Sequence, residues 1–482
     1  MLKKKVILLT GIVLLLILTA CGGNDTPVAG GNGTQANVGT GNVNADIPDD
    51  GSIGGNLTIW SFTNEALAFA TAFQEFHPDI EIDFSHMPLD VYIERLQHVF
   101  ASGVDVPDVV QLGGTFIRQF VESPFLMDIS DLLPYAREIE IFQHTIDSAT
   151  NDAGQIFGFA YQAPPNAMFY RRSMARDYLG TDDPNQVQEM FSDINRLMAS
   201  AEQIRDASNG EVFFTAHFEE LFDSFVFYRN QPWIMDNRLV ISEDMQAYID
   251  ISRRLRDGGL EAQIDRWSEA WFAGMSDTLV DASGNDRRIF AYFFPAWGLN
   301  HVLQHNAASE TTNTAGDWAM IPGPMPSWSI GSWLSVSRDS NNPVAAREFV
   351  KFVTLNPDTL ANYSLGVYSN EFLRQINPDL PTGIALHPGD FNSSYYVARR
   401  LLPQFDTGPV YEFLGGQNAF DVFSEIGRRT EPRHLLQATD EIINNAFNAA
   451  VASYLSGASS RDDALTFFKN SILIDIPGLI IN

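Results

Sequence analysis

The chain has 482 residues, of which 45% are apolar and 19% charged, a composition typical of globular proteins and not of disordered or fibrous ones. At roughly 150 residues per domain, this length predicts two or three domains, each large enough to bury a core. Sixty acidic and thirty basic residues give a formal charge of −30, which excludes nucleic acid and anionic membrane surfaces as general electrostatic partners.

The first 20 residues have the pattern of an export signal. Three lysines at 3–5 precede the apolar run Val6–Leu18, which is shorter than the about 20 residues that a transmembrane helix needs. Residues 18–21, Leu-Thr-Ala-Cys, resemble the lipobox of bacterial lipoproteins, in which the cysteine receives a diacylglyceryl group and the peptide is cleaved just before it. We expect residues 1–20 to be a lipoprotein signal peptide and Cys21 to anchor the protein to the cell membrane, facing the extracellular side or the periplasm. An ordinary secretory signal is the alternative.

Cys21 is the only cysteine of the chain, which excludes a disulfide framework, a zinc ribbon and a redox-active cysteine pair. The residues that follow it, up to 55, are rich in Gly and Asn and contain almost no large apolar side chain. Such a segment cannot offset its own ordering entropy. We therefore expect residues 21–55 to form the lipidated cysteine and a flexible tether.

Regular structure is predicted from residue 56 onward. A strand at 57–60 precedes a helix that Thr63 or Asn64 caps and that has apolar residues at three- and four-residue spacing. A strand at 80–84 and a helix over 93–100 follow, the helix ending at Gly103.

A third strand, at 108–112, completes an order of alternating strands and helices, which predicts a parallel α/β sheet with right-handed crossovers. Ligands bind such sheets outside the carboxyl ends of the strands. Residues 60–65 and 112–115 should therefore border a binding site.

Several segments share their order and spacing with one known family. They include the stretch YFFPAWGLNHVL at 292–303, and the whole set is 57–84, 106–133, 154–180, 292–303, 316–354 and 458–472. Together they resemble the extracellular solute-binding proteins of carbohydrate ABC importers, which are lipid-tethered receptors. The stretch 271–294 departs from that pattern because it lacks the family's Lys and is longer, so ligand identity is not carried over.

The resemblance implies an α/β, two-lobe periplasmic-binding-protein-like fold of type II, in which each lobe is a mixed sheet flanked by helices. Hinge strands join the lobes, and the proline-rich stretches Phe159–Pro165 and Ile321–Pro326 are the expected crossings. The expected lobes are 56–160 plus 328–372 for lobe one and 165–320 plus 385–482 for lobe two.

A sugar site needs flat rings against the C–H face of the ligand and hydrogen-bonding side chains around its rim. Trp297 matches the family's ring-stacking position after a proline, and Tyr411 lies where the family supplies a late aromatic residue. The ring candidates are Trp60, Tyr161, Trp297, Trp333 and Tyr411, and the hydrogen-bonding candidates are Glu65, Gln111, Thr115 and Gln417.

These features predict a membrane-tethered receptor that binds a carbohydrate, expected to be an oligosaccharide, and delivers it to the permease subunits of an ABC transporter. We expect no catalysis, no cofactor and no metal site, since the chain lacks the G-x-S-x-G, H-E-x-x-H and Walker motifs. Two alternatives stay open. The solute could be a polyamine or a peptide, or the protein could be a lipid-anchored glycosidase, because sixty acidic residues guarantee chance carboxylate pairs.

Overall fold

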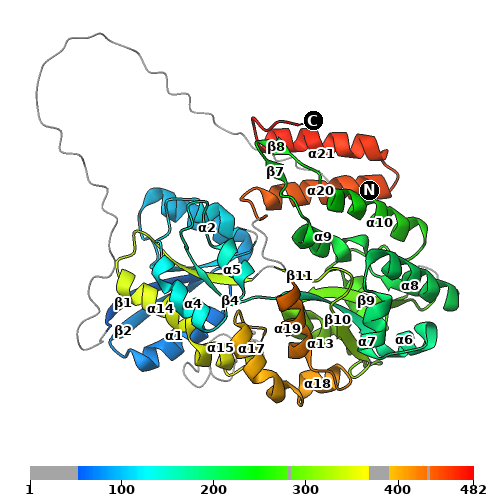
Figure 1. The fold of residues 1–482 in the computed structure, drawn as a ribbon, viewed down its shortest axis with the longest axis horizontal. Coiled ribbons are helices and arrows are strands. Elements are labelled where there is room, and N and C mark those ends of the chain that lie inside the picture. The colour runs from blue at the N-terminus through cyan, green and yellow to red at the C-terminus, as the bar shows by residue number, and fades with distance from the viewer. Residues whose placement is uncertain are drawn as a thin grey trace, which may run out of the picture. The chain divides into compact units, whose positions relative to one another are not determined.

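The computed structural model describes residues 53–114, 116–280, 284–329, 331–368, 390–430 and 435–481. The expected signal peptide, Cys21 and Thr115 lie outside these residues. The described chain forms two separate sheets, each covered by helices, so its architecture is the predicted pair of α/β lobes (Figure 1). Within this part of the chain, no helix combines the length and the apolar character needed to cross a membrane.

The first sheet begins as predicted. β1 pairs in parallel with β2 and with β3, and two helices, α1 (Glu65–Phe76) and α2 (Leu89–Ser102), make the connections. Gly103 ends α2 in the left-handed conformation that glycine adopts at little cost. Its strands, in the order β2-β1-β3-β12-β4, are β2 (Ile80–His86), β1 (Gly55–Ser61), β3 (Val109–Gly113), β12 (Ser332–Val336) and β4 (Phe159–Gln162).

β12 enters the first sheet from a distant part of the sequence. It lies antiparallel between β3 and β4, with Leu334 opposite both Gln111 and Phe159. All five of its residues are buried, because the strand has neighbours on both edges and helices on both faces. The first lobe therefore consists of two stretches of chain.

The second sheet has the order β10-β5-β9-β6, and β11 adds to β5. β5 is antiparallel to β9 and β10, while β6 is parallel to β9. The strands are β5 (Pro165–Arg171), β6 (Val212–Thr215), β9 (Arg288–Pro295), β10 (Trp318–Ile321) and β11 (Ser327–Trp328), with a separate hairpin of β7 (Ile234–Met235) and β8 (Arg238–Leu239).

Helices complete each lobe. Besides α1 and α2, the first lobe contains α3 (Ile117–Val121), η1 (Ser130–Leu132), α4 (Leu133–Glu138), α5 (Gln143–Ser148), α14 (Pro343–Leu355) and α15 (Pro357–Ser364). The second contains α6 (Arg172–Leu179), α7 (Pro184–Met190), α8 (Ile194–Ala207), η2 (Phe218–Leu221), α9 (Phe222–Tyr228), α10 (Glu243–Asp257), α11 (Glu269–Ala273), η3 (Gly274–Ser276), α12 (Ala296–Gly298), η4 (Leu299–Leu303), α13 (Gln304–Asn306), η5 (Leu402–Phe405), α18 (Pro409–Phe413), α19 (Ala419–Arg429), α20 (Asp440–Leu455) and α21 (Arg461–Asp475). One further helix, α17 (Tyr395–Leu401), packs against both lobes.

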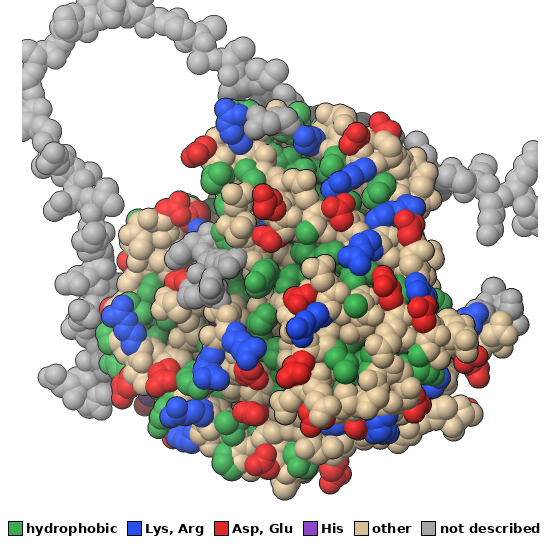
Figure 2. Space-filling model, turned by 45° about the vertical axis from the view of Figure 1, so that its right-hand side comes forward, with side chains coloured by type: hydrophobic (Ala, Val, Ile, Leu, Met, Phe, Trp, Pro, Cys, Tyr) green, Lys and Arg blue, Asp and Glu red, His purple; other side chains and the backbone are tan. Residues whose placement is uncertain are grey.

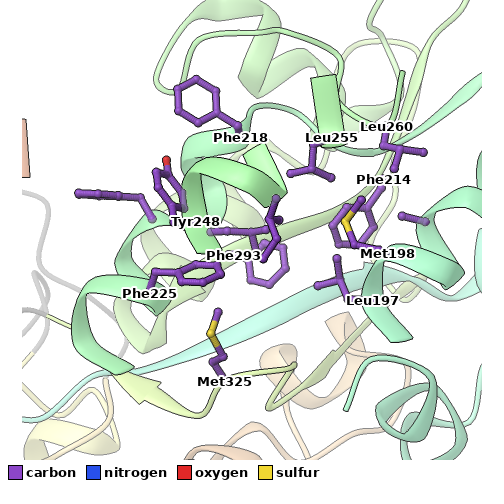
Figure 3. Packing of buried hydrophobic residues seen from close by; sticks show 14 of the residues in the cluster. Leu197, Met198, Phe214, Phe218, Phe225, Tyr248, Leu255, Leu260, Phe293 and Met325 are labelled. Atoms are coloured by element: carbon purple, nitrogen blue, oxygen red, sulfur yellow. The ribbon is translucent and has the colours of Figure 1, made fainter. Parts of the chain in front are cut away.

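The core of the second lobe joins residues from both ends of its sequence. Phe214 contacts Phe293 within the sheet and Phe225 contacts Tyr248 between the helices, and all four rings belong to the one cluster drawn in Figure 3. Phe447 of α20 belongs to the same cluster, so the C-terminal helices close this core. Figure 1 shows the red C-terminal helices beside the green elements that precede them by about half the chain.

The residues that the structure describes pass between the lobes at three places. Ala163 and Pro164 link β4 to β5, within the first predicted crossing. The second crossing lies later than predicted: residues 322–326 connect β10 to β11, both of which pair with β5, and the chain changes sheets after Ser329. The third crossing follows Asp390.

Side-chain hydrogen bonds explain the position of the second crossing. Asn166 of β5 donates from Nδ2 to Ser327 Oγ at 3.1 Å and to the Trp328 carbonyl at 3.3 Å. These contacts keep β11 in the second sheet after the proline-rich stretch has ended. In the third crossing, Asn392 forms an isolated β-bridge with Gln162, and Ser394 forms one with Ile141. These two bridges hold the crossing segment against the first lobe.

The acidic excess does not form a single charged surface on the face drawn in Figure 2, where acidic and basic side chains are interspersed. Exposed ion pairs of the described chain include Arg253 with Asp257 at 2.7 Å and Arg429 with Glu425 at 2.5 Å. On this face the charge has the distribution expected of a solvated surface.

Candidate functional site

Strand ends of the two sheets adjoin at the crossings. Gln162, at the end of β4, is opposite Ser332, and Pro165, two residues after Ala163, is opposite Trp328. β9 ends at Pro295 opposite Asn166. The carboxyl ends of β1, β3 and β4 thus lie on the side of the first sheet that meets the carboxyl ends of β9 and β6, and this is where ligands bind in open α/β sheets.

Three predicted site residues form one chain of hydrogen bonds at the first-lobe edge. The Tyr161 hydroxyl donates to Glu65 Oε2 at 2.8 Å and accepts from Gln111 Nε2 at 2.9 Å. Gln111 Oε1 in turn accepts from the hydroxyls of Ser61 and of Thr63, the latter at 3.1 Å. The structure therefore brings together Glu65 from α1, Gln111 from β3 and Tyr161 from β4, as their positions at strand and helix ends predict.

This chain of polar groups is held away from bulk water. Gln111 and Tyr161 have no exposed surface, whereas Glu65 is half-buried. Burial raises the pKa of the Glu65 carboxyl, and the hydrogen bonds from Tyr161 and Thr63 oppose that rise. Burial also raises the pKa of Tyr161 well above its usual value, so this hydroxyl keeps its proton and donates to the carboxylate.

A second carboxyl group, that of Asp390 in the third crossing, lies beside this chain of hydrogen bonds. Asp390 is 3% exposed and accepts from Gln162 Nε2 at 2.6 Å and from the Phe391 amide at 2.6 Å. Burial, opposed by the Phe391 hydrogen bond, raises its pKa from 3.8 to about 8, and the negative charge of Glu65 adds to the rise. Sequence reasoning did not select Asp390, because only the fold brings this distant segment to the end of β4.

Trp60 takes its predicted place at the end of β1 and is half-buried. Arg95 of α2 lies over its ring, with the guanidinium carbon 5.6 Å from the ring centroid. A cation over one ring face leaves the opposite face and the ring edge for other contacts. Trp60 therefore remains a candidate for ring stacking at the first-lobe edge.

The second-lobe edge carries a cluster of aromatic rings. Trp297 follows Pro295 at the end of β9 and is half-buried, and the ring of Trp267 lies nearly parallel to it, with 6.4 Å between centroids and 12° between planes. Trp267 also contacts Trp271 at 5.1 Å and Phe272 at 6.3 Å. Trp267 is the exposed member, with 52% of its surface accessible.

Polar side chains border these rings at the end of β6. His217 is 8% exposed, and its Nδ1 has no hydrogen-bond partner, although Glu219 Oε2 lies 3.6 Å away. Its Nε2 lies 3.9 Å from Asp265, whose own side chain is 91% exposed. Sequence reasoning missed this group; the signal available was the position of His217 two residues after the β6 strand.

Three other predicted residues have different surroundings. Trp333 has no exposed surface, and its indole N–H donates to the Thr145 carbonyl at 2.8 Å, so it offers no ring face to a ligand in this conformation. Gln417 accepts from the Met320 amide and donates to the Met320 carbonyl, both at 2.8 Å, so its amide already serves to hold β10. Tyr411 of α18 is half-buried near Gly416.

A cavity of about 620 Å³ lies on another flank, where α3 and α5 meet the segment before α20. Arg118 lines it and binds Glu122 Oε1 at 2.6 Å and the Thr150 carbonyl. Of the predicted ligand residues, none of the eight that the structure describes lines this cavity, and no described aromatic side chain lines it either. Its chemistry is that of a charged surface pocket and does not offer the ring faces that a sugar needs.

Comparison with known proteins identifies the family. The sequence model of one protein family, described as bacterial extracellular solute-binding protein, matches residues 68–369. The chain belongs to this family. Solute-binding proteins of this type bind a solute outside the cell, so the predicted recognition is confirmed. A comparison with curated proteins found no match to this solute-binding protein.

Solved structures confirm the two-lobe fold of this solute-binding protein. A crystal structure of an extracellular solute-binding protein family 1 has a TM-score of 0.70 at 18% identity, covering 86% of this chain and 98% of that one. The GacH receptor of Streptomyces glaucescens, solved unliganded and with acarbose, has a TM-score of 0.60 at 16% identity, covering 89% and 100%. The galacto-N-biose/lacto-N-biose I-binding protein of a Bifidobacterium longum ABC transporter, solved with lacto-N-biose, has a TM-score of 0.60 at 15% identity, covering 90% and 100%.

Proposed function

We propose that this solute-binding protein is a membrane-tethered extracellular receptor that binds an oligosaccharide between its two lobes and delivers it unchanged to the permease of an ABC transporter. The observation that carries the proposal is the pairing of two strand-end edges: a hydrogen-bonded polar chain on the first lobe and a partly exposed ring cluster on the second. The carbohydrate ligands of the GacH receptor and of the Bifidobacterium longum protein, which share the fold, support the choice of ligand class.

The chemistry of the two edges suits a sugar. Glu65 is a half-buried acceptor for ligand hydroxyls, and the hydrogen bond that it accepts from Tyr161 fixes its orientation. Trp60 on the first lobe and the ring cluster that includes Trp297 on the second supply ring surface from opposite lobes, and both tryptophans keep part of their surface accessible. Every ligand hydroxyl that leaves water needs such a partner, at a cost of about 1–3 kcal/mol when it has none.

Binding from both sides is what couples the ligand to the motion of the lobes. A ligand shifts an equilibrium between open and closed lobes only by its difference in affinity for the two states. A solute held by one lobe alone would leave that equilibrium unchanged. We therefore propose that residues of both edges contact the same ligand and that the closed form presents a patch from each lobe to the permease.

Ligand panels test this function against its alternatives. The full-length protein, purified in detergent, is melted in the presence of oligosaccharides, polyamines or peptides. A solute at about 100 times its dissociation constant adds about 2.7 kcal/mol of stability. Stabilisation by oligosaccharides alone supports the proposal, stabilisation by polyamines or peptides alone replaces the ligand class, and turnover of a glycoside would make the protein a glycosidase.

The lipid anchor forms a separate part of the proposal. We infer it from the sequence at Cys21, which the family's extracellular location suits. A diacyl group supplies the two chains that stable membrane attachment needs. In the Cys21→Ser variant we expect the protein to leave the membrane fraction and appear in the soluble extracellular fraction. Retention in the membrane would contradict the lipobox assignment.

A further inference from the structure

Trp267 is exposed in a way that packing does not explain. Its side chain is 52% accessible, although a large ring is normally buried in a core. Its backbone φ is +67°, a left-handed conformation that bulky residues rarely adopt. Strained positions persist where the surrounding structure enforces them, and they gather at sites that bind or react.

The turn that holds Trp267 is well defined. The Ser268 amide donates to the Asp265 carbonyl at 3.3 Å, which places Trp267 third in a four-residue turn. Turns with φ above zero at this position favour glycine. Ser268 then caps α11, since its Oγ accepts from the Trp271 amide at 3.2 Å. A turn and a helix cap on either side therefore fix the direction of the Trp267 ring.

The rings beneath Trp267 form a rigid base. Trp271 is fully buried, and its indole N–H donates to Glu220 Oε1 at 2.6 Å. The ring of Trp297 lies nearly parallel to that of Trp267, with 6.4 Å between the ring centroids. Trp267 is thus the ring of this cluster with the most surface open to solvent.

The surroundings place this ring at the carboxyl edge of the second sheet. The Ala262 amide donates to the Thr215 carbonyl and the Ile264 amide to the Ala216 carbonyl, both at 3.0 Å, so the segment leading to Trp267 runs beside the end of β6. His217 follows directly, with its Nδ1 3.6 Å from Glu219 Oε2 and its Nε2 3.9 Å from Asp265 Oδ1. Asp265 belongs to the same turn as Trp267, and its side chain is 91% exposed. A flat exposed ring with a carboxylate in the same turn is the combination that a sugar ring and its hydroxyls would satisfy.

We propose that Trp267 is the second-lobe ring on which the ligand stacks, and that Trp297 positions it from below. The assignment rests on the proposed function, because a ring platform with hydrogen-bonding groups at its rim suits an oligosaccharide. It replaces the sequence-based choice of Trp297 as the residue in direct contact.

Titration calorimetry of the full-length protein with gluco-, galacto- and xylo-oligosaccharides tests the assignment. We expect Trp267→Ala and Trp267→Gly to weaken binding of the recognised sugar by at least about tenfold, and Trp267→Phe to retain most of the affinity. Phe467→Ala serves as the matched control, because Phe467 is 66% exposed on α21, away from both sheet edges, and its loss should leave affinity unchanged.

Melting of the unliganded variants separates a binding role from a structural one. Glycine relieves the backbone strain at φ +67°, so Trp267→Gly should melt no lower than the wild type while binding more weakly. Unchanged affinity in Trp267→Ala would overturn the assignment and leave the proposed function standing. A lower melting temperature in Trp267→Gly would make the residue structural. If the wild type binds no oligosaccharide, the proposed function fails and this assignment fails with it.

Discussion

The buried carboxyl of Asp390 predicts that the stability of the protein falls as pH rises, and that Asp390→Asn removes much of this fall. The carboxyl is 3% exposed, and its pKa is about 8 instead of 3.8. Below pH 3.8 this carboxyl carries a proton in both the folded and the unfolded chain, so it does not lower the stability of the protein. As pH rises above 3.8, the unfolded chain releases the proton while the folded chain keeps it, so the free energy of unfolding falls. This fall levels off near pH 8, where the carboxyl also ionises in the folded protein.

The size of this loss of stability follows from the interval between the pKa values of the unfolded and the folded chain. Each pH unit between the two pKa values costs about 1.4 kcal/mol, so the raised pKa corresponds to an upper bound of about 4 kcal/mol at pH 7. Local rearrangement and water entry reduce such penalties in real proteins, and we expect about 1–3 kcal/mol. Asparagine is neutral at every pH, and an amide flip of Gln162 lets the two side chains keep a hydrogen bond.

Urea denaturation of the full-length protein, followed by circular dichroism between about pH 5 and pH 8.5, measures this effect. The wild type should lose more stability across the range than Asp390→Asn, which should be the more stable of the two at the alkaline end. Glu65 and Tyr363 are the titratable groups whose charges act on or respond to Asp390. Glu65 leaves a residual slope in the variant, since burial also raises its pKa.

The matched control is Asp462→Asn, because Asp462 is exposed on the first turn of α21. Its stability profile should follow that of the wild type. If the profiles of wild type and Asp390→Asn have the same slope, the carboxyl at 390 is ionised in the folded protein and the reasoning is refuted.

Two further predictions concern hydrogen bonds and charge. Tyr161→Phe removes the donor to Glu65 and the acceptor for Gln111, so urea denaturation should show a loss of about 1–3 kcal/mol; a loss below that range would mean that water replaces the hydroxyl. Arg229→Met leaves the buried carboxylate of Asp440 without its cation at 2.7 Å and should cost about 3–5 kcal/mol, part of which Asp440→Asn restores in the double variant. A double variant as unstable as the single one would speak against the ion pair as the cause.

Much of the first sheet could be predicted from sequence because its opening elements are local. The alternation at 80–84, the glycine after α2 and the apolar run at 109–112 each specify one element, and parallel pairing follows from their order. The place of β12 could not be predicted in the same way, since its neighbours in the sheet are distant in sequence. The second crossing was placed too early because prolines mark a turn but not the sheet that the following strand joins.

The candidate site was predictable where strand ends determine position. Glu65, Gln111 and Tyr161 meet because their elements end at one edge. Trp333 and Gln417 could not be distinguished from ligand residues, since only the fold shows that one is enclosed on both faces and that the other pairs with Met320. Trp267 was overlooked because a positive φ without glycine has no signature in sequence.

The interleaving of the two lobes has a consequence for how the polypeptide matures. β12 fills the gap between β3 and β4, so a nascent chain that stops before residue 332 has an incomplete first sheet. The second lobe likewise waits for Phe447 and Phe468 of its last two helices. Closing such long loops is slow compared with local pairing. The first lobe cannot finish before β12 has been synthesised, and the second cannot finish before α20 and α21 have been, so a growing chain shorter than these points has no completed core.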